Sequence, residues 1–188
     1  MTDRTTKRPD GLCWCILLRA DQIPRRVRVQ RSRPLRRAAI LEILSLQEAS
    51  YAVEAELIGS FDIPPLKDTA DTLRRCGETF CGFFAEGRLV GAISYRREGG
   101  VLDIHRLVVN TDHFRKGIAR ALVEHVEKNA ATVDRIVVST GTKNGPARHL
   151  YRSLGFEETR EAEVAAGLRI TFFKNPYPPA TSRGFRQW

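Results

Sequence analysis

Hydrophobic and polar positions in the first part of the chain follow two different periods, which predict one strand and two helices. Residues 27–30 alternate between valine and polar residues, as in a short strand, whereas the apolar residues of 40–49 recur at helical spacing. The loop Ile58–Leu66 contains one glycine and two prolines, which interrupt the helical region. A second, more polar helix is predicted around Thr69–Arg75.

The middle of the chain predicts three consecutive antiparallel strands. Thr79–Ala85, Leu89–Tyr95 and Val101–Val109 are rich in β-branched, aromatic and apolar residues. The connections between them are short and contain glycine, which is typical of tight turns between neighbouring antiparallel strands.

The second half predicts helices that alternate with strands. A helix from Gly117 to about Ala130 is followed by the strand Arg135–Thr140, the helix Asn144–Leu154, and a hairpin of Phe156–Ala165 with Leu168–Lys174. The first of these helices crosses between two strands, which makes that pair parallel. We expect an α+β fold with a mixed, mostly antiparallel central sheet of six to seven strands and about four helices.

The length of 188 residues and the hydrophobic fraction of 42% suit one domain, for which we expect the range 25–175. Residues 1–24 are expected to form a poorly ordered extension and residues 176–188 an irregular tail. The apolar run Leu12–Leu18 is too short for a membrane span of about 20 residues, and no signal-peptide cleavage site follows it. We therefore expect a cytoplasmic protein that is not associated with a membrane.

The net charge of +9 is concentrated at the start of the chain. Residues 1–37 hold 11 of the 31 Lys and Arg residues but only 3 of the 22 Asp and Glu residues. The rest of the chain is nearly neutral, which argues against a nucleic-acid-binding domain. The basic arm Arg25–Arg37, with seven arginines, is either a solvated leader or an arm that contacts phosphates.

The segment Val108–Leu122, V-V-N-T-D-H-F-R-K-G-I-A-R-A-L, predicts a buried strand that turns directly into a helix. The first N–H groups of a helix have no partner within it, and the helix dipole attracts anions to that end. Gly117 allows a ligand to approach closely, and three basic residues stand beside it. The segment is therefore a candidate pyrophosphate site, although it matches neither the dinucleotide fingerprint nor the P-loop.

The segment 144–156, N-G-P-A-R-H-L-Y-R-S-L-G-F, predicts a helix with well-marked ends. Asn144 is a good N-cap, Pro146 suits the first turn, and Gly155 is placed to end the helix. Tyr151 lies on the apolar face, about 10 Å along the helix from Asn144. One extended ligand is therefore able to contact both side chains.

Together, these two segments resemble the GNAT superfamily of acetyl-CoA-dependent N-acetyltransferases. The family motif Q/R-x-x-G-x-G/A is matched at Gly117 and Ala119, with Phe114 where Gln or Arg is usual. The later pattern N-x-x-A-x-x-L-Y-x-x-x-G-F is matched at every stated position of 144–156. In order and length the resemblance covers Val27–Lys174. It implies a GNAT-like fold that uses acetyl-CoA as co-substrate and no metal.

The resemblance also implies residue roles. Tyr151 is expected to protonate the leaving thiolate, while strand backbone contacts pantetheine and the helical turn wraps the pyrophosphate. The residues expected to hold the cofactor are Leu107, Val108, Val109, Arg115, Lys116, Gly117, Ile118, Ala119, Arg120 and Asn144.

The acceptor amine must lose a proton, because an amine with a pKa of about 10.4 is neutral in only about one molecule in 2,500 at pH 7. Asp103 is the first candidate base, since some family members carry a catalytic carboxylate at its place, and His105 on the same strand face is the alternative. The alternative is that neither is the base and that both are polar residues that contact the substrate or form hydrogen bonds at the strand edge. Glu54 and Glu56 are candidates for the acceptor site by family analogy. The alternative is that they lie on a solvated face of the helix.

The expected function is acetyl transfer to a primary amine by direct attack in a ternary complex. The acceptor is a small-molecule amine, a peptide N-terminus or a protein lysine, and a homodimer is expected by analogy. The alternative is a non-catalytic acyl-CoA-binding sensor or regulatory module of the same fold.

Overall fold

The computed structural model describes residues 37–130, 133–165 and 167–176. The predicted strand at residues 27–30, the extension 1–24, the tail from residue 177 and most of the basic arm lie outside the described residues. The elements are α1 (Arg37–Ile58), η1 (Pro64–Lys67), α2 (Ala70–Arg75), β1 (Thr79–Ala85), β2 (Arg88–Glu98), β3 (Val101–Val109), η2 (Thr111–His113), α3 (Ile118–Lys128), β4 (Arg135–Gly141), α4 (Gly145–Ser153), β5 (Glu157–Ala165) and β6 (Leu168–Pro176).

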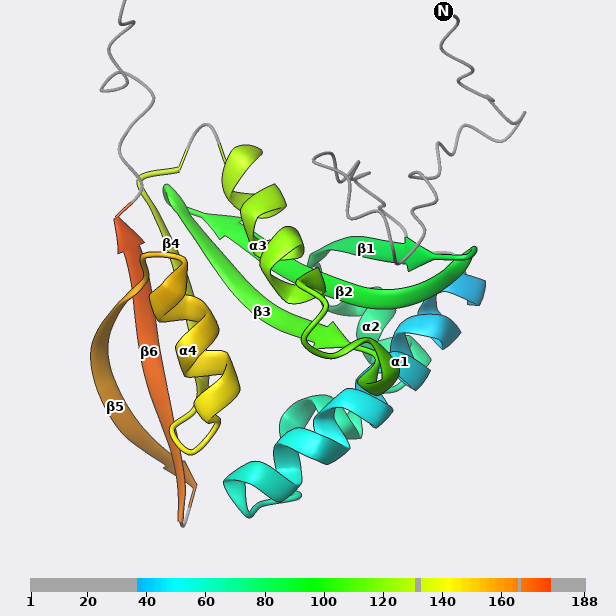
Figure 1. The fold of residues 1–188 in the computed structure, drawn as a ribbon, viewed down its shortest axis with the longest axis horizontal. Helices are drawn as coiled ribbons and strands as arrows, with labels where there is room; N and C mark the ends of the chain where they lie inside the picture. The colour runs from blue at the N-terminus through cyan, green and yellow to red at the C-terminus, as the bar shows by residue number, and fades with distance from the viewer. Residues whose placement is uncertain (1–36, 131–132, 166, 177–188) are drawn as a thin grey trace, which may run out of the picture.

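The described strands form one mixed sheet in the order β1-β2-β3-β4-β6-β5 (Figure 1). Only β3 and β4 pair in parallel, and α3 makes the crossover between them. The other neighbouring strands pair antiparallel. The predicted α+β class, the mostly antiparallel sheet with at least six strands, and the four α-helices are therefore confirmed.

Successive side chains of β2 and β3 point to opposite faces of the sheet and pack on different helices. Ala92 and Val108 are buried with Leu46 and Tyr51 of α1. Ile93 and its neighbours on the other face are buried in a larger cluster that includes α3, α4 and β6. The sheet is thus covered on both faces, by α1 and α2 on one and by α3 and α4 on the other.

The ladder between β3 and β4 is short. Val101–Ile104 pairs with Arg135–Val138, and both strands continue beyond these four residue pairs. Figure 1 shows β3 and β4 diverging from this point, β3 toward α1 and β4 toward α4. The space between the two strands lies in the middle of the sheet.

A β-bulge in β3 coincides with the end of this ladder. Opposite β2, Tyr95 pairs with Ile104 and Ser94 pairs with Arg106, so His105 is the additional residue. A bulge bends its strand and increases the local twist, which moves β3 away from β4. It also turns both His105 and Arg106 toward Glu78.

A buried ion cluster holds Arg106 in place. Its guanidinium donates to Glu78 and, at 3.0 Å, to Asp68, and Glu78 also accepts a 2.6 Å bond from Ser94. Gln47 of α1 donates to the same Asp68 carboxylate at 3.0 Å. Burial by itself lowers the pKa of Arg106, but the bonds to Glu78 and Asp68 outweigh it and raise that pKa. The cluster therefore ties α1 and the segment after η1 to the bulged strand.

Gly91 of β2 lies directly against the first turn of α3. A Cβ atom at this position would lie 2.7 Å from Cγ2 of Ile118 and 3.3 Å from Cδ1 of Leu122. Because Ile118 is β-branched and has little rotamer freedom in a helix, it has no easy way to make room. We expect Gly91→Ala to lower the free energy of unfolding by about 1–3 kcal/mol, as overpacking in a core does.

Denaturant titration measures this change, and Gly145→Ala is the matched control because a Cβ atom there meets nothing within 4 Å. An unfolding midpoint for Gly91→Ala equal to that of Gly145→Ala would show that α3 does not pack tightly on β2.

Candidate active site

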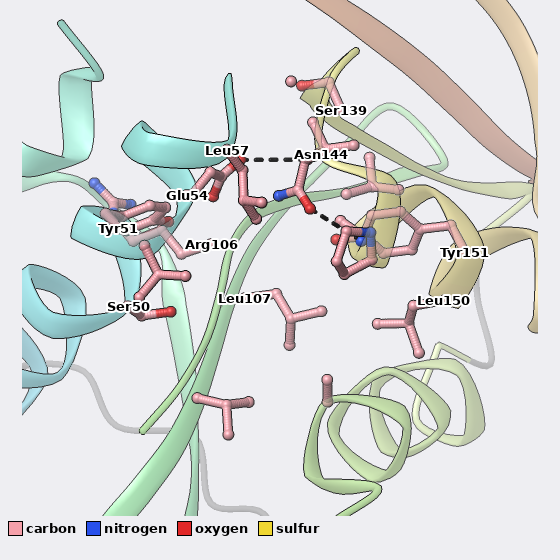
Figure 2. A pocket seen from close by; sticks show the side chains of 18 of the residues that line it. Ser50, Tyr51, Glu54, Leu57, Arg106, Leu107, Ser139, Asn144, Leu150 and Tyr151 are labelled. Atoms are coloured by element: carbon pink, nitrogen blue, oxygen red, sulfur yellow. Dashed lines mark hydrogen bonds between the residues drawn. The ribbon is translucent and has the colours of Figure 1, made fainter. Parts of the chain in front are cut away.

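The divergence of β3 and β4 opens into a pocket of about 1200 Å³. Its walls come from the C-terminal half of α1, the segment 63–65, the ends of β3 and β4, the turn before α3, the first turns of α4, and the β5–β6 hairpin. Figure 2 shows the arrangement, with Tyr51 and Glu54 on one side, Asn144 and Tyr151 on the other, and Leu107 between them. Segments separated by about a hundred residues thus meet in one cavity.

One end of the pocket is formed by the turn that leads into α3. Arg115 and Gly117 both have left-handed backbone conformations, with φ of 61° and 78°. The first backbone bond of α3 runs from Ala121 N–H to Gly117 O, so the N–H groups of residues 118–120 precede the helical ladder. Arg115 and Arg120 line the pocket beside them. This end therefore suits an anion, and the residues present fit the pyrophosphate of acetyl-CoA.

The backbone of β3 supplies the central wall. Leu107, Val108 and Val109 pair with β2 along one edge, whereas their other edge faces the space left by β4. The side chains of Leu107 and Val109 line the pocket, and Val108 is buried against α1. A strand with one available edge suits an extended ligand that carries amide groups, as the pantetheine arm does.

Asn144 caps α4 and also lines the pocket. Its side-chain oxygen accepts a 3.1 Å bond from Ala147 N–H, and the residue is only 8% exposed. In Figure 2 its amide NH₂ group points across the pocket toward Glu54. The predicted N-cap is therefore confirmed.

Tyr151 is held rigidly at the opposite wall. Its ring packs against Phe156 and Phe173 at centroid distances of 5.7 and 5.4 Å. Burial raises the pKa of the Tyr151 phenol well above its usual range, and the nearby Glu54 carboxylate raises it further. The phenol is therefore a proton donor at neutral pH.

Glu54 approaches the same region from α1. Its carboxylate accepts a 3.4 Å bond from the Thr140 hydroxyl at the end of β4. It is the only acidic side chain among the described residues that line the pocket. By contrast, Glu56 is exposed and does not line the pocket.

Tyr51 is a pocket residue that the sequence reasoning missed. It lies one turn before Glu54, and burial raises the pKa of its phenol, with Glu54 as the next cause and a smaller contribution from Tyr151. The available signal was a tyrosine on the apolar face of an amphipathic helix, the same signal that singled out Tyr151.

The two predicted bases lie together but differ in their access to the pocket. His105 Nδ1 lies 3.4 Å from Glu78 Oε1, and His105 Nε2 lies 3.6 Å from Asp103 Oδ2. Burial raises the pKa of Asp103, and His105 opposes that effect. His105 lines the pocket, whereas Asp103 does not. Of the predicted cofactor residues, Lys116 also lies outside the lining, next to Arg115 in the turn.

The described residues contain no group of three or more His, Cys, Asp or Glu side chains that is able to hold a metal ion. No helix within 37–130, 133–165 or 167–176 has the length and apolar character needed to cross a membrane.

Comparison with family models matches residues 40–156 to the acetyltransferase (GNAT) family. The chain belongs to this family of acetyltransferases. The matched range begins in α1 and ends directly after α4, so it contains both motifs on which the resemblance rested. The recognition made from residues 114–119 and 144–156 is therefore confirmed.

The chain is also similar to a relative of known sequence and to solved structures. The chain is 39% identical over 132 residues to UPF0157 protein YqkA of Bacillus subtilis (strain 168), an alignment that covers 70% of this chain and 38% of that protein. The chain thus spans well under half of the length of this relative.

Two crystal structures show the same fold. The ribosomal-protein-S18-alanine N-acetyltransferase from Escherichia coli matches with a TM-score of 0.64 at 16% identity, over 86% of this chain and 98% of that chain. The PaiA N-acetyltransferase from Thermoplasma acidophilum, in complex with coenzyme A, matches with a TM-score of 0.59 at 13% identity, over 80% and 100% of the two chains.

Two substitutions of Asn144 distinguish its capping of α4 from the role of its NH₂ group in the pocket. Asn144→Ala removes the bond to Ala147 N–H and is expected to lower the free energy of unfolding by about 1 kcal/mol. Asn144→Ser keeps a good N-cap and removes the NH₂ group, so its unfolding midpoint should stay near that of the unchanged protein. Chemical denaturation of both variants measures the difference, and equal destabilisation would contradict a capping role.

Proposed function

We propose that this protein is an N-acetyltransferase that moves the acetyl group of acetyl-CoA directly to a primary amine, with both substrates bound together. One observation carries the proposal. A single pocket is lined at one end by the turn before α3 and at the other by Glu54, with Tyr151 on the wall opposite Glu54. Two substrates that enter from these two ends meet beside β3, which suits direct transfer in a ternary complex.

The donor end would be held mainly by the backbone. The N–H groups at the start of α3, with Arg115 and Arg120, receive the pyrophosphate, and the available edge of Leu107–Val109 receives the amide-containing arm. The acetyl thioester supplies an activated carbonyl when it is bound. Phe114 stands where the family usually has Gln or Arg, and it lines the pocket beside Arg115. The backbone N–H groups would contact the pyrophosphate without the help of this side chain.

Tyr151 would act as the general acid. The leaving group of the transfer is a thiolate, and the phenol lies in the same pocket as the β3 edge. A tyrosine phenol is protonated throughout the neutral range, and the burial that raises the pKa of Tyr151 does not change this, so a proton is present to donate to the sulfur.

Glu54 would bind the acceptor ammonium and take up its proton. It is the one described carboxylate in the pocket, and Tyr151 lies close enough to interact electrostatically with it. Asp103 lacks access to the pocket, and His105 is engaged with Glu78 and Asp103. The arrangement therefore favours Glu54 over Asp103 as the base, with His105 as the alternative.

Neither described cysteine lines the pocket, which favours direct attack over a route through a cysteine acyl-enzyme. In direct attack, the acceptor nitrogen forms the bond to the acetyl carbon as the bond to sulfur breaks. The ammonium first gives one proton to Glu54, and the nitrogen loses a second proton as the amide forms. The Tyr151 proton passes to the leaving sulfur, and the second nitrogen proton restores the phenol.

Tyr151→Phe tests the function and the general acid together. We expect turnover to fall about 10²-fold or more, because the variant loses one proton donor and almost no volume. The dissociation constant for acetyl-CoA should change little, because the phenol is not part of the anion site. Single-turnover acetyl transfer, followed by release of free thiol, measures the first quantity, and calorimetric titration measures the second.

Tyr95→Phe is the matched control, since Tyr95 is a buried tyrosine that does not line the pocket. Unchanged single-turnover transfer in Tyr151→Phe would remove the general-acid role. Tight acetyl-CoA binding without thiol release for any amine would instead favour the non-catalytic sensor.

Glu54→Gln tests the acceptor end. We expect kcat/KM for the amine to fall about 10²-fold, because the neutral amide neither attracts an ammonium nor takes its proton. The KM for acetyl-CoA should remain close to that of the unchanged enzyme.

Glu56→Gln, two residues further along the same helix, removes the same charge outside the pocket and should retain activity. Asp103→Asn provides the comparison with the other candidate base. A larger loss in Asp103→Asn than in Glu54→Gln would reverse the assignment.

A further inference from the structure

The acceptor end of the pocket is lined largely by apolar side chains. Apolar side chains of α1, the segment before η1 and the β5–β6 hairpin line much of it, together with Glu54 and the polar groups of Ser50, Tyr51 and Thr140. We call this part the acceptor lobe, and its apolar lining includes Val53, Leu57, Ile58, Ile63, Val164 and Leu168. Such a surface binds hydrocarbon by burial, at roughly 25 cal/mol per Å² of apolar area removed from water.

The charges of the acceptor lobe limit what an acceptor is able to carry. Among the described lining residues, Glu54 alone has a negative charge, so the lobe balances one ammonium and not two. The Arg106 guanidinium lines the pocket but is paired with both Glu78 and Asp68 and is only 12% exposed, so it does not offer a counter-charge to a carboxylate on the acceptor. The Lys143 ammonium lies near Gly59 but does not line the pocket.

Large apolar side chains also surround the mouth of the acceptor lobe. Leu57 is 46% exposed, Val164 is 54% exposed, and Phe61 is 67% exposed between the lining residues Ile58 and Ile63. Exposed apolar side chains that gather beside a pocket mark a surface for a ligand. These three come from α1, its following loop and β5, so they extend the apolar wall outward from the lobe.

We propose that the acceptor is a small apolar monoamine, an aralkyl or alkyl amine with a single ammonium and no carboxylate. Its ammonium lies at Glu54, and its hydrocarbon body lies between Leu57, Ile63 and Val164. This inference rests on the proposed N-acetyltransferase activity and adds the chemical class of the acceptor. A second ammonium or a carboxylate placed in this lobe loses its hydration without gaining a partner, and so weakens binding.

Two matched pairs of amines test the class with the 188-residue chain and acetyl-CoA. Hexylamine and 1,6-diaminohexane differ by one terminal ammonium, and 2-phenylethylamine and phenylalanine differ by one carboxylate. We expect the monoamine of each pair to have a kcat/KM at least about tenfold higher, measured by release of free thiol. Equal or faster acetylation of the diamine or the amino acid would overturn the assignment.

An engineered carboxylate provides the converse test. Leu57→Glu places a second acidic group at the rim of the lobe and should raise the ratio of kcat/KM for 1,6-diaminohexane to that for hexylamine about tenfold. Leu41→Glu makes the same substitution at another exposed position of α1 that does not line the pocket and should leave the ratio unchanged. Equal ratios in both variants would show that the acceptor does not lie beside Leu57.

Binding without turnover separates this inference from the proposed activity. In the presence of coenzyme A, hexylamine and 2-phenylethylamine should raise the melting temperature of the unchanged protein and not that of Glu54→Gln. Acetylation of diamines, amino acids or peptide N-termini without acetylation of the monoamines overturns the acceptor class and leaves N-acetyl transfer standing. Absence of thiol release with every amine, despite bound coenzyme A, overturns both.

Discussion

The parallel ladder between β3 and β4 ends after four residue pairs, and the candidate active site depends on this ending. A continuous ladder would close the middle of the sheet and leave no edge of Leu107–Val109 for a ligand. The bulge at His105 supplies the local cause, because an additional residue opposite β2 bends β3. The pocket therefore results from the divergence of the two strands and not from small side chains that leave a gap between them.

The bulge also places Arg106 where its charge has partners. Asp68 and Glu78 come from two different segments, and both carboxylates meet the same guanidinium. Loss of one member of such a buried cluster typically costs about 3–5 kcal/mol, because the remaining charges stay buried without a partner. The cluster therefore holds the segment after η1, and with it one side of the acceptor lobe, against the bulged strand.

The chemistry of the pocket follows from an uneven distribution of charge. Basic side chains and free N–H groups gather at the start of α3, and the one described carboxylate of the lining stands at the other end. Tyr151 lies on the wall opposite Glu54, packed against Phe156 and Phe173, and its burial raises the pKa of its phenol. In the proposed transfer, an anionic donor and a cationic acceptor would bind at opposite ends of the pocket, with Tyr151 as the proton donor near the place where they meet.

Much of the fold could be predicted from local sequence patterns. Hydrophobic periodicity predicted the helices and strands of the described residues, and the cap at Asn144 was placed correctly because a cap depends on residues three positions apart. The end of α1 was also predicted, because the proline-containing loop Ile58–Leu66 interrupts the helical pattern there, and Gly59 takes the left-handed conformation directly after the helix. The two motifs 114–119 and 144–156 carried the family, since each is contiguous in the chain.

The amino-acid sequence by itself thus determined the elements, the turn before α3 and the face on which Tyr151 lies, because these depend on neighbours within a few residues. Only the tertiary structure decided that Glu54 meets Thr140 across 86 residues, that Tyr51 joins the pocket, and that Asp103 stays outside it. The physical reason is that a single bulge and the packing of α1 against the end of β4 set which side chains face one another. Neither leaves a periodic signal in the sequence.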